Sequence, residues 1–187
     1  MMKVIILLVI ILATKIEAAC RPRFHYWRPY NGTIPNDAFV AGLDDDGRRN
    51  YIVKIMPLDE YSWVVPAQLR ECEHHVNFGW CCGTDKVMKI DQFIEVLCTN
   101  DPLNLAWRKV NRFADEISNH CCFVQGGYGK HDNHVYNNLI GRIIVNGILY
   151  TGRAYLERSW DGIHFMDGMN STKLTQNFEM LTYDCQR

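Results

Sequence analysis

Three consecutive aspartates, Asp44, Asp45 and Asp46, precede Gly47 and form the densest group of potential ligand atoms in the chain. A carboxylate accepts hydrogen bonds from hydroxyl groups and also binds hard cations. A calcium-binding loop of the helix-loop-helix type needs acids at alternating positions and a distal Glu, and this spacing is absent. Asp is also favoured in tight turns, where its side chain bonds the local backbone. Two interpretations of Asp44 therefore stay open, a ligand-binding carboxylate and a turn residue.

The run Cys72-Glu73-His74-His75, with Cys81-Cys82 downstream, contains the residue types of a zinc site. Structural zinc sites use thiolates paired at short fixed gaps, and thiols of an exported chain oxidise instead. We therefore expect no metal. The sequence also has no Gly-x-Ser-x-Gly phrase and no glycine-rich nucleotide loop after a strand. These patterns predict a protein that is not an enzyme and that uses no cofactor.

The first residues have the pattern of an export signal. Lys3 is followed by the apolar run from Val4 to Leu12 and by the small residues Ala18-Ala19. The run is too short to cross a bilayer, so we predict a signal peptide over 1–19 and a secreted, extracellular protein. A bacterial lipoprotein is a competing interpretation of Ala18-Ala19-Cys20, but Glu17 is a poor residue just upstream of such a box. The formal net charge of −1 argues against nucleic acid as a partner.

An exported chain with an even number of cysteines favours a disulfide framework. We expect three or four bridges, whose connectivity the sequence leaves open, among Cys20, Cys72, Cys81, Cys82, Cys98, Cys121, Cys122 and Cys185. The sequons Asn31-Gly32-Thr33 and Asn170-Ser171-Thr172 predict glycosylation at Asn31 and Asn170.

The two halves of the chain contain similar phrases in the same order. An alignment anchored on Tyr51-Ile52-Val53-Lys54 and Tyr150-Thr151-Gly152-Arg153 brings the Asx-Gly turns Asp46-Gly47 and Asn146-Gly147 together. Each half begins near a tryptophan, Trp27 or Trp107, and each ends on an aromatic-Glu-aliphatic-Leu phrase, 93–97 or 178–181. Short apolar runs with Asx-Gly turns predict an all-β fold. The segment Leu103 to Glu116 is the exception, where the apolar spacing indicates one short helix or turn.

The first half resembles the DM-nine repeat family, the natterin-like secreted proteins. The resemblance rests on Trp27, Ile34-Pro35-Asn36-Asp37-Ala38, Gly42-Leu43-Asp44, the Asp46-Gly47 turn and Glu95-Val96-Leu97. It implies two tandem antiparallel β repeats related by a pseudo-twofold axis, built as small sandwich or barrel lobes. We expect the first repeat over 20–101 and a divergent second repeat over 102–187, with a Cys-rich insertion at 114–134.

The resemblance further implies a lectin that binds mannose-type glycans in innate immunity or at a host interface. In the family an Asp and a Lys hold the sugar. The Asp maps to Asp44, Gln68 stands in place of the Lys, and His164 lies near the second Lys position. The variable stretches before Gln68 and His164 contain Trp63 and Trp160, and aromatic rings stack on sugars. We therefore expect a sugar site formed by Asp44, Gln68, Trp63, His164 and Trp160.

The missing Lys and the divergent second half favour an alternative, a salivary or venom effector that binds a protein partner with a degenerate sugar site. The expected partners are therefore a carbohydrate or a protein. A homodimer is an open alternative to a monomer, and we expect no membrane insertion.

Overall fold

The computed structural model describes residues 24–57, 63–80, 87–110, 122–131, 134–156, 162–174 and 176–183. The predicted signal peptide and the sugar-site residue Trp160 lie outside these ranges, as do Cys20, Cys81, Cys82, Cys121 and Cys185. Over the described ranges, no helix has the length and hydropathy that a membrane span requires.

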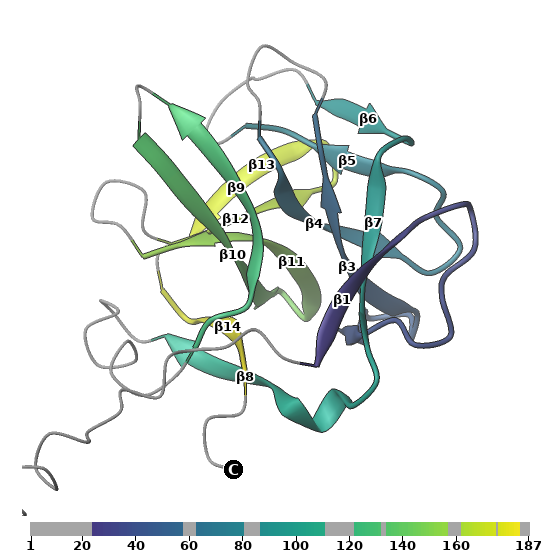
Figure 1. Cartoon of the computed structure of the whole chain (residues 1–187). Coiled ribbons are helices and arrows are strands. Elements are labelled where there is room, and N and C mark those ends of the chain that lie inside the picture. The colour runs from purple at the N-terminus through teal and green to yellow at the C-terminus, as the bar shows by residue number, and fades with distance from the viewer. Residues whose placement is uncertain are drawn as a thin grey trace, which may run out of the picture.

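The fold is all-β, as the sequence predicts, and its sheets are antiparallel (Figure 1). The strands of the first half are β1 (His25–Pro29), β2 (Val40–Leu43), β3 (Arg49–Ile55), β4 (Val65–Arg70), β5 (Val76–Phe78), β6 (Met88–Ile90) and β7 (Ile94–Thr99). Those of the second are β8 (Leu105–Val110), β9 (Gln125–His131), β10 (His134–Val145), β11 (Ile148–Tyr155), β12 (Gly162–Asp167), β13 (Asn170–Leu174) and β14 (Phe178–Tyr183).

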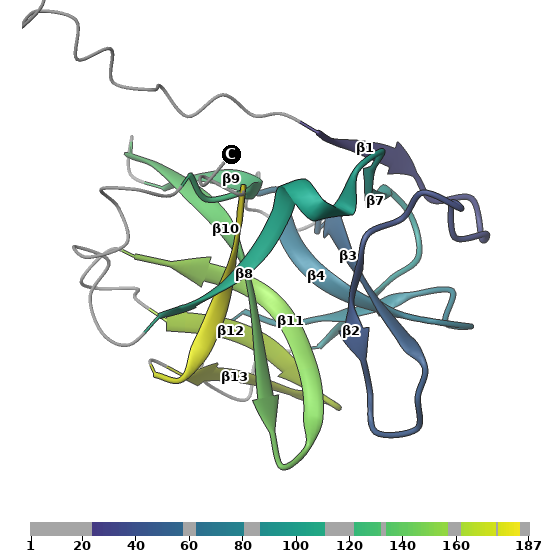
Figure 2. The same ribbon diagram turned by 90° about the horizontal axis from the view of Figure 1, so that it is seen from below.

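The strands of the first half form a five-stranded sheet in the order β1-β7-β3-β2, in which β4 also pairs with β3, and β5 pairs separately with β6. The second half forms a seven-stranded sheet in the order β13-β12-β11-β10-β14-β8, in which β9 also pairs with β10. Among the described strands both sheets are open, so neither half is a closed barrel. Figure 2 shows β4 and β11 in the middle of the molecule, where the two sheets meet.

The short helix or turn expected between the halves is a single 3-10 turn, η1 (Pro102–Asn104), which Asp101 caps through a hydrogen bond from the Leu103 N–H. The chain then extends directly into β8, so the helical spacing of Trp107 and Val110 does not describe the local structure. Pairing with β14 along the whole of β8 outweighs this weak periodic signal.

The apolar side chains form three clusters because successive residues of a strand point to opposite faces. On β7, Val96 and Cys98 face a cluster within the first half, while Leu97 faces a cluster shared by both halves. On β14, Met180 faces a cluster within the second half and Leu181 faces the shared one. The shared cluster also takes Ile52 and Ile140, so the two sheets bury a common core.

The cysteines differ from the expected framework of eight bridged residues. Cys72 and Cys98 are free thiols, so the prediction of a disulfide is wrong at these two positions. Cys98 lies on β7 with its side chain buried in the first-half core, where it acts as a small apolar residue. Cys72 is exposed, in the turn after β4. Cys122 is disulfide-bonded, and neither Cys72 nor Cys98 is its partner.

Strand pairing relates the two halves differently from the sequence alignment. Trp27 lies opposite Leu97 in the β1–β7 pair, and Trp107 lies opposite Leu181 in the β8–β14 pair. The strand beside β7 is β3, and the strand beside β14 is β10. Tyr51 is on β3, whereas Tyr150 is on β11, which does not pair with β14. The two anchor tyrosines therefore lie on strands with different neighbours, while each tryptophan lies opposite the Leu of a closing phrase, and the tandem repeat itself stays a prediction.

Candidate functional site

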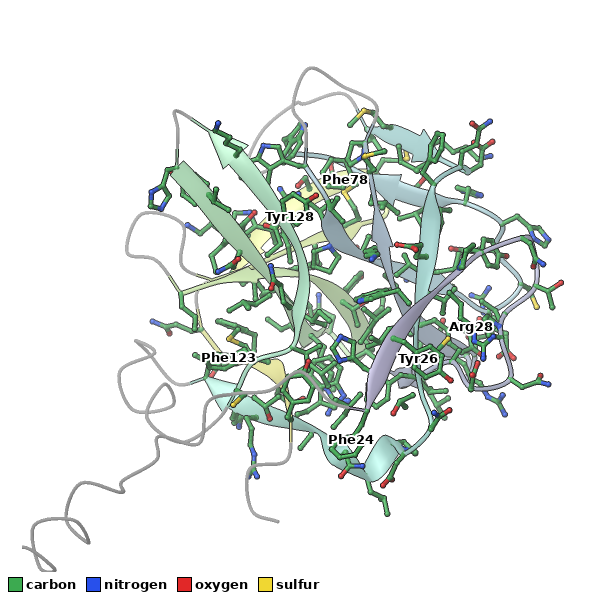
Figure 3. The ribbon with its side chains drawn as sticks, in the orientation of Figure 1. Phe24, Tyr26, Arg28, Phe78, Phe123 and Tyr128 are labelled. Carbon is green, nitrogen blue, oxygen red and sulfur yellow. The ribbon has the colours of Figure 1, made fainter. Side chains whose placement is uncertain are left out.

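A cleft of about 80 Å³ lies where β4 of the first sheet and β5 of the two-stranded sheet meet β11 and β12 of the second sheet. Its lining is mainly polar and includes Gln68, Arg70, Glu73, Thr151, Arg153 and His164. Phe78, which also lines the cleft and is labelled in Figure 3, lies at the end of β5. A water-sized group needs about 10–15 Å³ measured in this way. The cleft therefore accommodates a small polar group and not a whole drug-sized ligand.

Arg153 is the most unusual residue of this cleft. It is only 5% exposed, and its guanidinium lies 5.2 Å from the centroid of the Phe78 ring and 5.0 Å from that of Trp80. Within the part of the chain that the structure describes, Arg153 forms no ion pair and no side-chain hydrogen bond. Burial lowers the pKa of this guanidinium. A buried cation without a carboxylate is rare in proteins.

The two ring contacts compensate only part of the cost of burying this charge. A desolvated cation–π contact contributes about 2 kcal/mol, whereas removing one ion from water costs several kcal/mol. The guanidinium also has five N–H donors, and stacked rings satisfy none of them. Arg153 thus presents unused donors and an uncompensated positive charge in the cleft.

Thr151 and Arg153 are two residues apart on β11, so their side chains point to the same face of the strand. The Thr151 Oγ1 is buried and has no hydrogen-bond partner. His164 lies opposite Arg153 in the β11–β12 pair, and its ring contacts that of Tyr155 edge-on at 5.3 Å. Three polar side chains from two neighbouring strands therefore converge on the cleft.

Gln68 also lines the cleft, but its amide group is already used within the protein. Its Nε2 donates to the Asn50 Oδ1 at 2.7 Å, and its Oε1 accepts from the Thr151 backbone N–H at 2.8 Å. The side chain thereby joins β4 to β3 and to β11 of the other sheet. One Nε2 hydrogen is left to donate to a ligand.

Asp44 lies in the turn between β2 and β3 and does not line the cleft. Its Oδ1 accepts from the Arg48 backbone N–H at 2.8 Å, as in the turn interpretation, and its side chain is only 2% exposed. Its Oδ2 lies 4.0 Å from the Nε of the cleft residue Arg70. The carboxylate therefore lies near a lining residue without lining the cleft itself.

The neighbouring acids of this turn have opposite pKa shifts. Burial is the main cause that raises the pKa of Asp44, whereas a hydrogen bond from Arg48 lowers that of Asp46. The carboxylates of Asp44, Asp45 and Asp46 come within 4.8 Å of one another. The Arg48 Nε lies 2.6 Å from Asp46, so a cation already occupies this acidic group.

Trp63 packs outside the cleft, against the other sheet. Its ring stacks on that of Tyr136 at 5.9 Å and meets the Trp80 ring edge-on at 5.5 Å. The ring also covers Gly129 of β9, where an added Cβ would come within 2.0 Å of it. Trp63 thus reaches the cleft only indirectly, through Trp80 and Arg153.

The structure therefore brings two of the five expected sugar-site residues, Gln68 and His164, to one cleft. Asp44 lies next to the lining residue Arg70, Trp63 is separated from the lining residue Arg153 by Trp80, and Trp160 is outside the described residues. Sequence reasoning missed Thr151 and Arg153. Both belong to the Tyr150-Thr151-Gly152-Arg153 phrase used to align the halves, but nothing in the phrase reveals that Arg153 is buried without a carboxylate.

Both predicted glycosylation sites are on the surface. Asn31 and Asn170 are exposed, and the Asn31 Oδ1 accepts from the Thr33 backbone N–H at 3.2 Å. In the run considered for zinc, His74 is exposed and its Nδ1 lies 3.4 Å from the Tyr30 hydroxyl. Cys81 and Cys82, the other residues of that group, lie outside the described ranges.

A scan against protein-family models and a search of curated proteins find no match to this chain. The resemblance to the DM-nine repeat family thus depends on the quoted residues alone.

Proposed function

We propose that this chain is a secreted glycan-recognition protein that acts by binding, without a catalytic step. The observation that carries the proposal is the polar cleft in which Gln68 and His164, one from each half of the chain, lie together. Polar side chains that converge on a concave surface are the usual features of a ligand site. The position of these two residues supports the site implied by the family resemblance.

We also propose that the two halves are copies of one ancestral unit. In the first half, the Lys54 Nζ lies 4.9 Å from the centroid of Trp27 and 2.7 Å from Glu95. In the second, the Arg142 guanidinium lies 4.5 Å from the centroid of Trp107, and its Nε lies 2.6 Å from Glu179. Two aromatic–cation–Glu triads on corresponding strands support a common origin.

A protein-binding effector is the second candidate, and a specific observation favours it. The Asp44 side chain is 2% exposed, and the Gln68 amide is bonded on both its nitrogen and its oxygen. Two residues expected to hold the sugar are therefore engaged within the protein itself. A surface that evolved from such a site would bind a protein through other residues.

A glycan array with the purified secreted chain, paired with pull-down from host-surface extracts, distinguishes the two candidates. Glycan recognition predicts carbohydrate signals that His164→Ala, in the wall of the cleft, abolishes. His74→Ala, at an exposed histidine outside the cleft, is the matched control and should retain them. An array without signal, alongside a proteinaceous hit in the pull-down, would support the effector instead.

Calorimetric titration with mannose then tests Asp44 directly. If the buried carboxylate only closes the turn and supports Arg70, Asp44→Ala should weaken binding through loss of folding stability and not through a lost sugar contact. Comparison at a temperature where both proteins are fully folded separates these effects. Equal heats at that temperature would exclude Asp44 from the site.

A further inference from the structure

We propose that the cleft between β4 and β11 binds the anionic group of an acidic saccharide, with Arg153 as its counter-ion. This inference deepens the proposed glycan recognition and names its ligand class. The shared chemistry is a carboxylate or a sulfate ester attached to a sugar, in place of the neutral mannose implied by the family resemblance.

The first argument is the state of Arg153. Its side chain is 95% buried and lines the cleft. Among the described residues, its guanidinium contacts the rings of Phe78 and Trp80 and no carboxylate. The guanidinium fork matches the two oxygens of a carboxylate or sulfate, which accept two parallel N–H bonds. An anion entering the cleft would supply the counter-charge that the described residues do not provide.

The second argument is the Thr151 hydroxyl, which comes from the same face of β11. Its Oγ1 is buried without a partner and can donate to a third ligand oxygen. The backbone beneath it is fixed, because the Thr151 N–H donates to Gln68 across the sheets. Two independent polar groups are therefore unused at the same place, held on one rigid strand.

The charges around the cleft agree with an anionic ligand. Among the described residues that line it, Arg70 and Arg153 carry positive charge and Glu73 is the only carboxylate. Asp44, the carboxylate near Arg70, lies 4.0 Å from the Arg70 Nε and does not line the cleft. Within the described ranges Arg153 has no such carboxylate neighbour, so the residues there leave its positive charge uncompensated.

The size of the cleft selects a group and not a whole sugar. A volume of about 80 Å³ holds a few water-sized groups, which is enough for a carboxylate or sulfate. The rest of the saccharide would remain outside the cleft.

Calorimetry at constant ionic strength tests the proposal with three matched sugars: glucuronate, glucose 6-sulfate and neutral glucose. We expect at least one acidic sugar to bind about tenfold or more tightly than glucose. Preference between glucuronate and glucose 6-sulfate identifies the anionic group. Inorganic sulfate alone, followed through its effect on the melting temperature, tests the anion site without any sugar.

Three variants locate the effect. Arg153→Met keeps the apolar stem and removes the charge, so the preference for acidic sugars should disappear. Arg153→Lys keeps the charge but loses the fork, and should retain only part of the affinity. Arg28→Met removes the same charge from an exposed position on β1, well separated from Phe78 in Figure 3, and should bind as the unmodified protein does.

The outcomes separate this inference from the proposed function. Glycan binding with equal affinity for acidic and neutral sugars would overturn the inference and leave glycan recognition standing. An empty glycan array, together with sulfate stabilisation that Arg153→Met removes, would overturn glycan recognition and retain the anion site. If Arg153→Met does not fold, a weaker preference for acidic sugars in both Thr151→Val and Arg153→Lys supports the anion site, and an unchanged preference in both overturns it.

Discussion

Gln68 on β4 accepts a hydrogen bond from the backbone N–H of Thr151 on β11, with 2.8 Å between the two atoms. This hydrogen bond links the two sheets directly. The Nε2 of the same amide donates to the Asn50 Oδ1 on β3. Gln68, one of the residues expected to bind sugar, thus joins the two sheets of this protein.

Gln68→Leu should destabilise the protein by about 2–4 kcal/mol. The substitution leaves the Asn50 Oδ1 and the Thr151 N–H unpaired in a buried place, and each lost partner costs about 1–3 kcal/mol. Urea unfolding measures the change. Gln125→Leu is the matched control, since Gln125 is exposed on β9 and its loss should cost less than about 1 kcal/mol. Equal unfolding midpoints for the two variants would exclude the bridging role.

Thr151→Val should stabilise the ligand-free protein by about 1 kcal/mol, because it replaces a buried, unpaired hydroxyl with a methyl group of similar size. Thr182 on β14 provides the contrast. It is equally buried, but its hydroxyl donates to the Ala106 carbonyl at 3.0 Å, so Thr182→Val should destabilise by a similar amount. Thermal unfolding of both variants measures whether each substitution raises or lowers the stability of the protein. A loss of stability in Thr151→Val would mean that its hydroxyl is satisfied in solution.

The two aromatic–cation–Glu triads should contribute unequally to stability. Arg142 contacts Trp107 and Glu179 and also donates to the Ala41 carbonyl across the sheets at 2.7 Å. Arg142→Ala should therefore cost about 2–3 kcal/mol, because it removes the ring contact and leaves a half-buried carbonyl unpaired.

Lys54→Ala is the matched change in the other half, and should cost less than about 1 kcal/mol because it removes only a partly exposed pair and a ring contact. Urea unfolding in low and high salt compares the two. Equal costs for Lys54→Ala and Arg142→Ala would show that the Ala41 bond contributes nothing.

These triads show which parts of the fold the sequence could predict. The sequence predicts where each half begins and ends, because these places lie next to strong apolar runs. They are marked by Trp27 and Glu95 in the first half and by Trp107 and Glu179 in the second. The strand order in the middle of each half is harder to predict from the sequence. Asp46-Gly47 connects β2 to β3, whereas Asn146-Gly147 connects β10 to β11, and both simply mark a hairpin. A local turn signal cannot reveal which strand of the sheet comes next.

The sequence predicted only those residues of the candidate site that belong to a recognised motif. Gln68 and His164 followed from the family pattern, and both line the cleft. Arg153 was not predicted, because an Arg two residues after a Thr in a strand is a common sequence pattern. Its importance comes from packing between Phe78 and Trp80, which lie far away in the chain. Likewise, Asp44 matched its motif, yet the turn around it uses the carboxylate.

The two free cysteines should differ in their reactivity. Cys72 is exposed and should react with iodoacetamide in the native protein. Cys98 is fully buried, and burial raises the pKa of its thiol to about 11, so it should react only after denaturation. Peptide mapping by mass spectrometry identifies the labelled residues. If neither cysteine is labelled in denaturant without a reductant, both are oxidised in the purified protein.

Stability should fall in alkaline solution because of Tyr150. Its hydroxyl donates to the Asp167 Oδ1 at 2.7 Å, and burial together with this bond raises its pKa from 10.0 to about 12. A phenol whose folded-state pKa is raised stabilises the fold fully below its unfolded value. That contribution is lost as the pH rises from 10 towards 12. Burial raises the pKa of Tyr183 to about 12 as well, so it adds to the same decline.

Tyr150→Phe should lower stability near neutral pH by about 1 kcal/mol, through the lost hydrogen bond, and should weaken the decline above pH 10. The difference between variant and unmodified protein therefore narrows as the pH rises. Urea unfolding at a series of alkaline pH values measures how steeply the stability of the variant and of the unmodified protein falls with pH. Tyr128→Phe is the control, because Tyr128 is 55% exposed and labelled on β9 in Figure 3, and it should leave the decline unchanged. An unchanged slope in Tyr150→Phe would assign the alkaline loss to another residue, with Tyr183→Phe as the next variant to measure.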